Sequence, residues 1–378
     1  MRHHQYNKNY EFVRQPEEFT KYTERNFLQY CLGATLYMPA TKFILDSLLN
    51  NKLEGLTSLV MCFEDAIDKS ELPKAEENVI NILNIIAEKV EKNEIEEKDL
   101  PLFFLRVRSP EQFRLFSDHL AKKQIRLITG FVFPKFTTKN GYLYLSQLKE
   151  LNIKHSEILY GMPILESNEI VYKETRTYEL TGIRNLLRPY KELILNLRVG
   201  ATDFSSKFGV RRGMDYSIYD ILMVRDALSD ILNFLTREED DYVISGPVWE
   251  YFLADKDTKF EDLNQDINRS LLKRNTIINE AIDGLLREVI LDKANGFVGK
   301  TIIHPSHLKY VNAMQSVTRE EYEDALQILD TSGGVIKSTN NNKMNEINPH
   351  RNWAKKIYTK ARAYGVIETE SCYSKLFR

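Results

Sequence analysis

The amino-acid sequence predicts an α/β protein whose alternating strands and helices close into a (β/α)8 TIM barrel. Short runs of β-branched, aromatic and other apolar residues recur along the chain, as expected for parallel strands buried on both faces. Segments with helical periodicity separate these runs, and strand–helix units with right-handed crossovers close most economically as a barrel. An open doubly wound sheet would carry a glycine-rich phosphate turn after an early strand, and the sequence has none there.

Eight runs of this kind are present, and each is predicted to form one strand of the barrel. They cover residues 34–39, 58–63, 102–107, 130–134, 157–165, 193–200, 242–248 and 300–304. Between the second and third runs, apolar side chains from Val79 to Val90 recur on one helical face. Ser109 and Pro110 predict the start of the next helix, with a capping residue followed by proline at the first helical position. Asp215 is a candidate cap for the helix between the sixth and seventh runs.

The same pattern divides the chain into three parts. Residues 1–32 form an N-terminal extension that is expected to pack across one end of the barrel. Residues 33–330 form the barrel itself, with a long helical stretch over 257–292 before the last strand. Glycine and asparagine clusters between 331 and 342 mark a loop or hinge, so residues 331–378 are expected to form a mobile C-terminal helical appendage.

Composition argues against several classes of function. The chain of 378 residues has 52 basic and 54 acidic side chains, and it shows no basic field for a nucleic acid or a membrane surface. Its three cysteines, Cys31, Cys62 and Cys372, are too few and too widely spaced for a zinc ribbon or a disulfide framework. Because no apolar leader and no bilayer-spanning apolar run is found, the protein is expected to be cytoplasmic.

Polar residues stand at the ends of the predicted strands, where the active site of a barrel lies. These residues are Thr41, Glu64, Asp65, Arg106, Arg108, Lys135, Glu166, Asp203, Ser245 and His304. Glu166 and Asp203 end adjacent strands, and two carboxylates without a nearby His or Cys suit a hard cation such as Mg²⁺. The alternative is that both residues only cap the helices that follow them.

Arg106 ends an otherwise apolar strand, where a guanidinium needs an anionic partner. That partner is either a substrate carboxylate held by two hydrogen bonds or a structural carboxylate from Glu64 or Asp65. His304 is interpreted as a hydrogen-bonded packing residue rather than a base. Lys135 is interpreted as a residue at the rim of the barrel, with a direct catalytic role as the alternative.

Short motifs on successive predicted strands resemble the citrate lyase β-subunit family, which also contains malyl-CoA lyases and HpcH/HpaI aldolases. The motifs are Phe-Glu-Asp-Ala at 63–66, Leu-Arg-Val at 105–107, Phe-Pro-Lys at 133–135, Ile-Leu-Glu at 164–166, Gly-Ala-Thr-Asp at 200–203 and Gly-Lys-Thr-Ile-Ile-His-Pro at 299–305. Arg108 stands where the family usually has asparagine. The resemblance extends from about Leu32 to the C-terminus, and it is nearest to C–C bond lyases found beside bacterial tellurium-resistance and stress genes.

This resemblance implies a magnesium-dependent lyase that breaks or forms a carbon–carbon bond by retro-Claisen or retro-aldol chemistry. Glu166 and Asp203 would ligate Mg²⁺, or Mn²⁺ in its place, and the metal would stabilise an enolate. Arg106 would hold a substrate carboxylate, with Lys135 and Thr202 also on the substrate side. The substrate would be a carboxylated oxo or hydroxy acid or its coenzyme A thioester.

The resemblance also implies supporting roles outside the metal site. Glu64 and Asp65 would orient Arg106 or metal-bound water. In relatives, a segment after the barrel folds as a lid, often over a neighbouring subunit's site, and carries an acidic residue for proton transfer. Glu346 is the candidate here, although the segment around it departs from the family's Asp-Lys-Pro. A site shared in this way implies a homotrimer or homohexamer.

The departure in the lid segment leaves other functions open. One alternative is a barrel that has kept the metal- and ligand-binding site without turnover. The other is transfer chemistry of the phosphoenolpyruvate or pyruvate type, which would use the same carboxylates and the same arginine.

Overall fold

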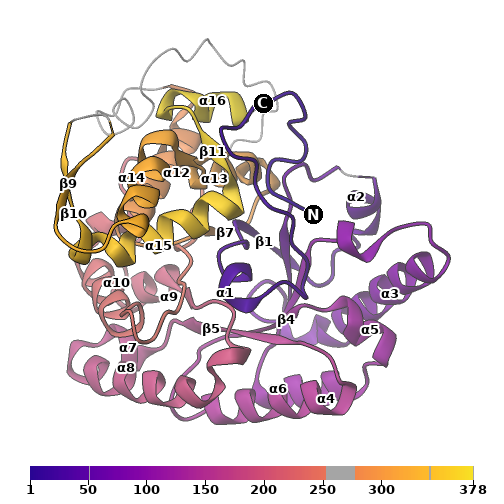
Figure 1. The fold of residues 1–378 in the computed structure, drawn as a ribbon. Helices are drawn as coiled ribbons and strands as arrows, with labels where there is room; N and C mark the ends of the chain where they lie inside the picture. Colours follow the sequence, from indigo (N-terminus) through magenta and orange to yellow (C-terminus); the bar gives the residue numbers. More distant parts are fainter. Residues whose placement is uncertain (51, 253–276, 340–341, 378) are drawn as a thin grey trace.

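The computed structural model describes residues 1–50, 52–252, 277–339 and 342–377. Seven parallel strands form one curved sheet in the order β6-β5-β4-β3-β2-β1-β7 (Figure 1). Their bounds are β1(Ala34–Pro39), β2(Ser58–Cys62), β3(Leu102–Arg106), β4(Gly130–Phe133), β5(Tyr160–Leu165), β6(Arg198–Val199) and β7(Lys300–Ile302). These strands coincide with seven of the eight predicted runs, although β5 and β6 begin later than predicted.

Residues 242–246 close the ring between β6 and β7 without forming a regular strand. Leu197 pairs in parallel with Ile244, and Gly246 pairs in parallel with Lys300. Pro247 follows directly and has no amide hydrogen with which to extend the ladder. The seventh predicted run therefore lies at its expected place in irregular form, and the predicted barrel fold is confirmed.

Helices cover the outside of the sheet (Figure 1). Those of the barrel are α2(Leu45–Leu49), α3(Leu72–Glu91), α4(Pro110–Asp118), α5(Lys122–Leu127), α6(Gly141–His155), α7(Asn168–Val171), α8(Lys173–Leu187), α9(Ala201–Lys207), α10(Leu222–Leu235), α12(Glu280–Ala294) and α13(Leu308–Gln315). In α3, Val79, Ile82 and Leu83 are buried on the predicted face. The Ser109 hydroxyl accepts a hydrogen bond from the amide of Gln112, which confirms the predicted cap of α4. Within the described residues, no helix has the length and apolar character needed to cross a membrane.

Two predicted helical features differ from the structure. Ser217, rather than Asp215, caps the turn before α10: its hydroxyl accepts a hydrogen bond from the amide of Tyr219, and Asp220 accepts one from the amide of Ser217. Of the helical stretch predicted over 257–292, α12 accounts for the last part. Residues 253–276 lie outside the described residues.

The interior of the barrel is filled by inward-facing residues of the strands, including Val60, Phe104 and Val132. The same apolar cluster contains Leu28, from α1(Arg25–Leu28) of the N-terminal extension, and Tyr364 near the C-terminus. Residues from both extensions therefore fill the end of the barrel at which the strands begin. This is the packing predicted for residues 1–32.

The C-terminal segment packs against that same end of the barrel. It consists of β8(Val317–Thr318), α14(Arg319–Asp330), β9(Val335–Lys337), β10(Met344–Glu346), α15(Ile347–Tyr364), β11(Val366–Ile367) and α16(Tyr373–Leu376). α15 lies against α14 (Figure 1). The Tyr364 hydroxyl donates a hydrogen bond to the carbonyl of Tyr30 (2.6 Å) and accepts one from the amide of Gly33 (3.1 Å), just before β1. The end of α15 therefore lies at the face of the barrel opposite the carboxyl ends of the strands.

Candidate active site

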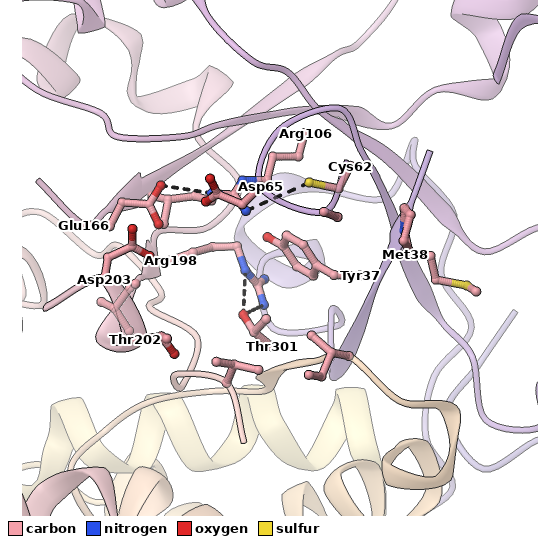
Figure 2. Close-up of a pocket in the computed structure, with 17 residues that line it drawn as sticks. Tyr37, Met38, Cys62, Asp65, Arg106, Glu166, Arg198, Thr202, Asp203 and Thr301 are labelled. Atoms are coloured by element: carbon pink, nitrogen blue, oxygen red, sulfur yellow. Dashed lines mark hydrogen bonds and ion pairs between the residues drawn. The ribbon is translucent and has the colours of Figure 1, made fainter. Parts of the chain in front are cut away.

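A cavity of about 420 Å³ opens at the carboxyl ends of the strands, where the sequence predicts the active site (Figure 2). Parallel barrel strands all end at one face, so residues that are distant in the sequence meet there. The polar and charged residues of the wall are Tyr37, Asp65, Arg106, Glu166, Arg198, Thr202, Asp203 and Thr301. The cavity therefore brings together most of the predicted site residues.

Glu166 and Asp203 face one point in this cavity. Glu166 follows β5 directly, and Asp203 lies in the first turn of α9 after the neighbouring strand β6. A Cβ atom at Gly200 would lie 2.5 Å from Oε2 of Glu166 and 3.2 Å from Oδ2 of Asp203. Two carboxylate oxygens thus border the same small volume, which the missing side chain of Gly200 leaves open.

The electrostatics of this pair favour a bound cation. Burial raises the pKa of Glu166 to about 7; the charge of Arg106 opposes the shift and that of Asp203 adds to it. Burial also raises the pKa of Asp203. A divalent cation between the two carboxylates would favour their charged forms. Mg²⁺ is usually bound through one or two carboxylates and keeps several waters, so the pair fits it, although the described ranges contain no cluster of three or more His, Cys, Asp or Glu suited to a metal.

Arg106, at the end of β3, is surrounded by carboxylates of the protein itself. Its Nη2 lies 2.7 Å from Oε2 of Glu64, 3.1 Å from Oδ2 of Asp65 and 3.1 Å from Oε1 of Glu166. Burial alone would lower the pKa of Arg106, but these carboxylates, Glu166 foremost, raise it. These are the contacts of the salt-bridge alternative, so the guanidinium is already neutralised without a substrate.

Lys135, after β4, supports the same constellation in two ways. Its backbone amide donates a hydrogen bond to Oε1 of Glu166 (2.9 Å), and its ammonium pairs with Glu64 and lies 3.3 Å from Oδ1 of Asp65. The backbone of Lys135 has φ +47°, in the left-handed region that non-glycine residues seldom adopt. This conformation accompanies the amide contact that holds Oε1 of Glu166, while Oε2 remains beside the Gly200 position near Asp203.

Arg198, on β6, is a wall residue that the sequence reasoning missed. It is 1% exposed, and it donates two hydrogen bonds to the hydroxyl of Thr301 (3.2 and 2.6 Å; Figure 2). A third goes to the hydroxyl of Thr35 (3.3 Å). No carboxylate of the described chain forms an ion pair with Arg198, and burial lowers its pKa. The available signal was an arginine inside the apolar run 193–200, directly before the Gly-Ala-Thr-Asp motif.

Tyr37, on β1, is the neighbour of Arg198 across the cavity. Its ring lies 5.4 Å from the Arg198 guanidinium. Its hydroxyl is buried and has no hydrogen-bond partner within the described residues. A buried polar group without a partner is costly, so both side chains are suited to a polar ligand in this part of the cavity.

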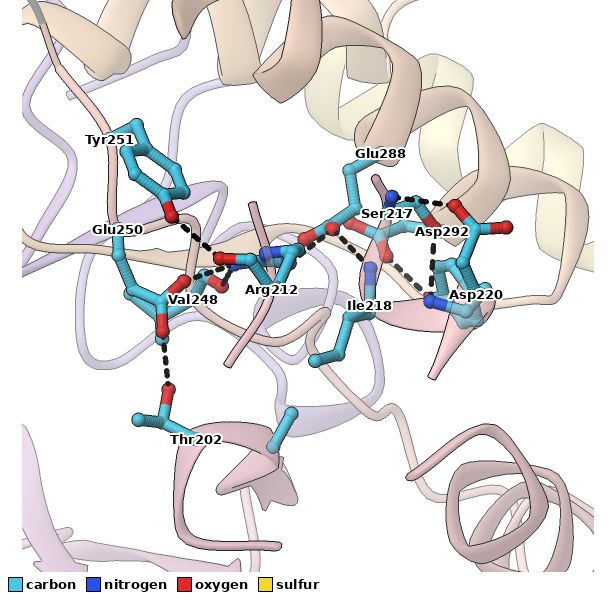
Figure 3. Close-up of polar contacts among 12 residues, drawn as sticks. Thr202, Arg212, Ser217, Ile218, Asp220, Val248, Glu250, Tyr251, Glu288 and Asp292 are labelled. Atoms are coloured by element: carbon cyan, nitrogen blue, oxygen red, sulfur yellow. Dashed lines mark hydrogen bonds and ion pairs between the residues drawn. The ribbon is translucent and has the colours of Figure 1, made fainter. Parts of the chain in front are cut away.

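A chain of polar contacts connects the cavity to α12 (Figure 3). The Thr202 hydroxyl donates a hydrogen bond to Oε1 of Glu250 (3.1 Å), and Oε2 of Glu250 pairs with Arg212 (2.7 Å). Arg212 also pairs with Glu288 of α12, which is fully buried. Thr202, predicted to bind substrate, therefore lines the cavity, and its hydroxyl is engaged by Glu250, which lies outside the cavity wall.

Lys300, the first residue of β7, extends this network into the core. Its Nζ lies 2.9 Å from Oε1 of Glu288 and 2.7 Å from Oδ2 of Asp292, and all three side chains are buried. The Tyr219 hydroxyl donates a further hydrogen bond to Asp292 (2.5 Å). The carboxylates are thus paired, which is the condition under which buried charges are tolerated.

Glu346 and His304, like Glu64 and Lys135, are not among the residues of the cavity wall. Glu346 is exposed at the junction of β10 and α15 and does not line the cavity of its own chain. His304 accepts a hydrogen bond from the amide of Ser306 (3.3 Å), and its ring stacks on Phe252 with centroids 4.2 Å apart. This environment agrees with the interpretation of His304 as a packing residue.

The family model for C–C bond lyases of the TIM-barrel fold matches residues 26–366. The chain belongs to this family. The predicted barrel fold and the predicted enzyme class, a carbon–carbon lyase, are therefore both confirmed. Among curated proteins, no match to the sequence of this C–C bond lyase is found.

Solved structures resemble this C–C bond lyase in fold. CitE from Mycobacterium tuberculosis, in complex with magnesium, acetoacetate and coenzyme A, is 14% identical with a TM-score of 0.50, covering 88% of this chain and 99% of that chain. RipC from Yersinia pestis is 14% identical with a TM-score of 0.46, covering 76% and 95%. The citrate lyase β subunit from M. tuberculosis, complexed with oxaloacetate and magnesium, is 15% identical with a TM-score of 0.43, covering 74% and 95%.

Proposed function

We propose that this C–C bond lyase acts with a divalent cation, Mg²⁺ or Mn²⁺, held by Glu166 and Asp203. Its reaction is retro-Claisen or retro-aldol cleavage, or the reverse, of a carboxylated oxo or hydroxy acid or its acyl-CoA thioester. The observation that carries the proposal is that the buried carboxylate of Glu166 and the half-buried carboxylate of Asp203 border one point beside Gly200. When bound there, the cation would supply Lewis-acid stabilisation of the negative charge that develops on a substrate oxygen.

Around this pair, the other charged residues act as positioning groups. Arg106 and the amide of Lys135 hold Oε1 of Glu166, which fixes the orientation of the whole carboxylate. Glu64 and Asp65 hold Arg106 in turn, and their charges also engage the Lys135 ammonium. These four residues therefore maintain the geometry of the site, while direct contact with substrate is left to other groups.

We assign the substrate carboxylate to Arg198 and Tyr37 rather than to Arg106. A buried guanidinium without an anion is destabilised until a ligand neutralises it, and a carboxylate does so with charge-assisted hydrogen bonds. A guanidinium has five N–H donors, and only three hydrogen bonds are made here, all to threonine hydroxyls. The role predicted for Arg106 thus passes to Arg198, which lies in the same cavity wall as the carboxylate pair.

The metal site is tested by titrating Mn²⁺ into metal-free protein and following its free concentration by electron paramagnetic resonance. The double variant Glu166→Gln/Asp203→Asn should weaken Mn²⁺ binding by more than the roughly 10–100-fold typical for loss of an outer-shell partner. Glu250→Gln, behind Thr202 and outside the cavity wall, is the matched control and should bind Mn²⁺ like the wild type. Undiminished binding in the double variant would refute the metal site.

The substrate assignment is tested with Arg198→Met. Acetoacetate, oxaloacetate, pyruvate and acyl-CoA thioesters form the panel, because solved proteins of similar fold bind small carboxylates or coenzyme A. In the presence of metal, active compounds should raise the unfolding temperature of the wild type and fail to raise that of the variant. Full ligand-induced stabilisation of Arg198→Met would contradict the assignment, while an unchanged Mn²⁺ affinity would show that the metal site is independent of it.

We further propose that the C–C bond lyase assembles as a trimer or a multiple of three, in which Glu346 acts in a neighbour's site. This is supported by the exposure of Glu346 and its place outside its own cavity. Glu346→Gln and Asp203→Asn should each lack activity alone, but mixed oligomers should regain part of it because one site is then intact. A monomer by light scattering at micromolar concentration would exclude the shared site.

A barrel that binds metal and ligand without turnover is the second candidate. The observation in its favour is that the predicted acid–base residue, Glu346, is not part of the cavity in its own chain. Nuclear magnetic resonance of the whole panel with enzyme and Mg²⁺ separates the two candidates. Stabilisation by a ligand with no product formed would favour the binding barrel, and any cleavage product that Asp203→Asn fails to form would favour the lyase.

A further inference from the structure

A second cavity, of about 430 Å³, lies between α12, α14 and α15. It is lined by Phe297 and Val298, immediately before β7, whereas the active-site cavity is lined by Thr301 and Ile303 further along that strand. The two cavities therefore lie toward opposite ends of β7. The rest of its wall includes Lys293, Glu321, Trp353, Lys356, Lys360 and Tyr373.

Lys360 is the residue that distinguishes this cavity. It is 8% exposed, and within the described parts of the chain its ammonium forms no hydrogen bond and no ion pair. Burial lowers the pKa of Lys360 to about 8, and the nearby charge of Lys293 adds to this effect. The charge of Glu321, on the same wall, acts against this shift without a direct ion pair. A buried ammonium that faces a cavity without a directly paired anion is costly and would be stabilised by one.

The surrounding charges increase this excess of positive potential. Lys356 precedes Lys360 by one helical turn of α15 and lines the same cavity. Lys293 donates a hydrogen bond to the Tyr373 hydroxyl (3.0 Å). Two acids, Glu321 and Glu370, line the same cavity, so the three lysines outnumber them. Oε2 of Glu321 accepts hydrogen bonds from the amide and hydroxyl of Thr318, the cap of α14 (3.0 and 2.9 Å).

We propose that this C-terminal cavity binds a small organic anion, with a phosphate or carboxylate headgroup at Lys360 and Lys356. The apolar part of the ligand would lie against Trp353 and Phe297, because aromatic walls favour a ring or an alkyl chain. The volume is within the range of small-molecule sites. The site is independent of the proposed catalytic metal, since it shares no wall residue with the active-site cavity.

Titration of metal-free protein with inorganic phosphate, and separately with acetate, tests this site. Trp353 supplies a fluorescence signal, because the chain has two tryptophans and the other, Trp249, is fully buried. Calorimetry gives the affinities. Tighter binding of phosphate would identify a phosphate ester as the ligand class, and tighter binding of acetate would identify a carboxylate. Binding of neither anion would overturn the proposal.

The variants separate this cavity from the active site. Lys360→Met should weaken anion binding at least tenfold and fold normally, because it removes an unpaired buried charge. Should it fail to fold, Lys356→Met, at a less buried position, should still weaken binding several-fold. Arg198→Met removes the guanidinium of the other cavity and should leave the anion-induced change in Trp353 fluorescence as in the wild type. The site would be refuted if both lysine variants bound the anion with the affinity of the wild type. It would also be refuted if Arg198→Met lost the change in Trp353 fluorescence.

Discussion

Replacing Glu166 by glutamine should make the metal-free protein more stable at pH 8. Glu166 is 4% exposed and faces Asp203, so its negative charge is held in a buried site beside another carboxylate. Glutamine removes the charge but keeps an oxygen that accepts hydrogen bonds from Arg106 and the amide of Lys135. The substitution therefore mainly removes the free-energy cost of burying a negative charge.

The size of the effect follows from the raised pKa of Glu166. Burial shifts the pKa from the ordinary 4.5 to about 7 in the folded protein. The protonated form thus favours folding: its contribution is complete below about pH 4.5 and is lost as the pH rises through about 7. At 1.36 kcal/mol per pKa unit, Glu166→Gln should gain about 3 kcal/mol over the wild type at pH 8, and about 1 kcal/mol at pH 5.

Urea unfolding at several pH values in the presence of a chelator measures this difference. Glu179→Gln is the matched control: Glu179 is also 4% exposed, but it lies outside the cavity and accepts two hydrogen bonds from Thr138. No gain is expected there. Adding Mg²⁺ should reverse the order, since only the wild type binds it tightly. A Glu166→Gln protein that is less stable than the wild type at pH 8 without metal would refute the reasoning.

Three further perturbations address the framework of the site. Among the described residues, Lys300→Met leaves the buried Asp292 without an ion-pair partner, while Glu288 keeps only Arg212. The loss should be about 3–5 kcal/mol in urea unfolding. Lys52→Met, at an exposed ion pair with Asp46, should cost no more than about 1 kcal/mol. Equal effects of the two substitutions would contradict the account of the buried network. Gly200→Ala places a Cβ 2.4 Å from that of Glu166. The resulting overpacking should lower the free energy of unfolding by about 1–3 kcal/mol and weaken Mn²⁺ binding. An unchanged Mn²⁺ affinity would show that this close approach is unimportant. Tyr37→Phe removes a hydroxyl without a partner, so stability should stay within about 1 kcal/mol while carboxylate binding weakens; a large loss of stability would reveal a missed hydrogen bond.

The strands and the carboxylate pair were predictable because both depend on local sequence. A strand buried on both faces appears as an apolar run, and its last polar residue marks the catalytic face. Glu166 and Asp203 follow consecutive runs, so barrel order alone makes them neighbours. The irregular form of residues 242–246 was not predicted, since apolar composition does not reveal how Pro247 limits the ladder.

The lack of an ion-pair partner for Arg198 among the described residues was not predictable, because the residues around it come from distant parts of the chain. Tyr37, Thr35 and Thr301 reach it only when the first and last strands pair. For Arg106, the sequence left two possible partners, a substrate carboxylate or a carboxylate of the protein. Only the three-dimensional arrangement shows that three acids of the protein surround it. For the C-terminal segment, glycine and asparagine clusters mark the loop but not the packing of α15 against α14.

The hydrogen bonds of Tyr364 to Tyr30 and Gly33 set an order of events during synthesis. These bonds close the end of the barrel at which the strands begin, and they join residues separated by 334 and 331 positions in the chain. During translation, the apolar inner surface of the half-made cylinder therefore stays accessible to water until α15 has left the ribosome. A nascent chain halted before residue 364 would expose apolar residues that Tyr364 covers in the complete fold. Such a chain is a natural client for chaperones that recognise apolar surface.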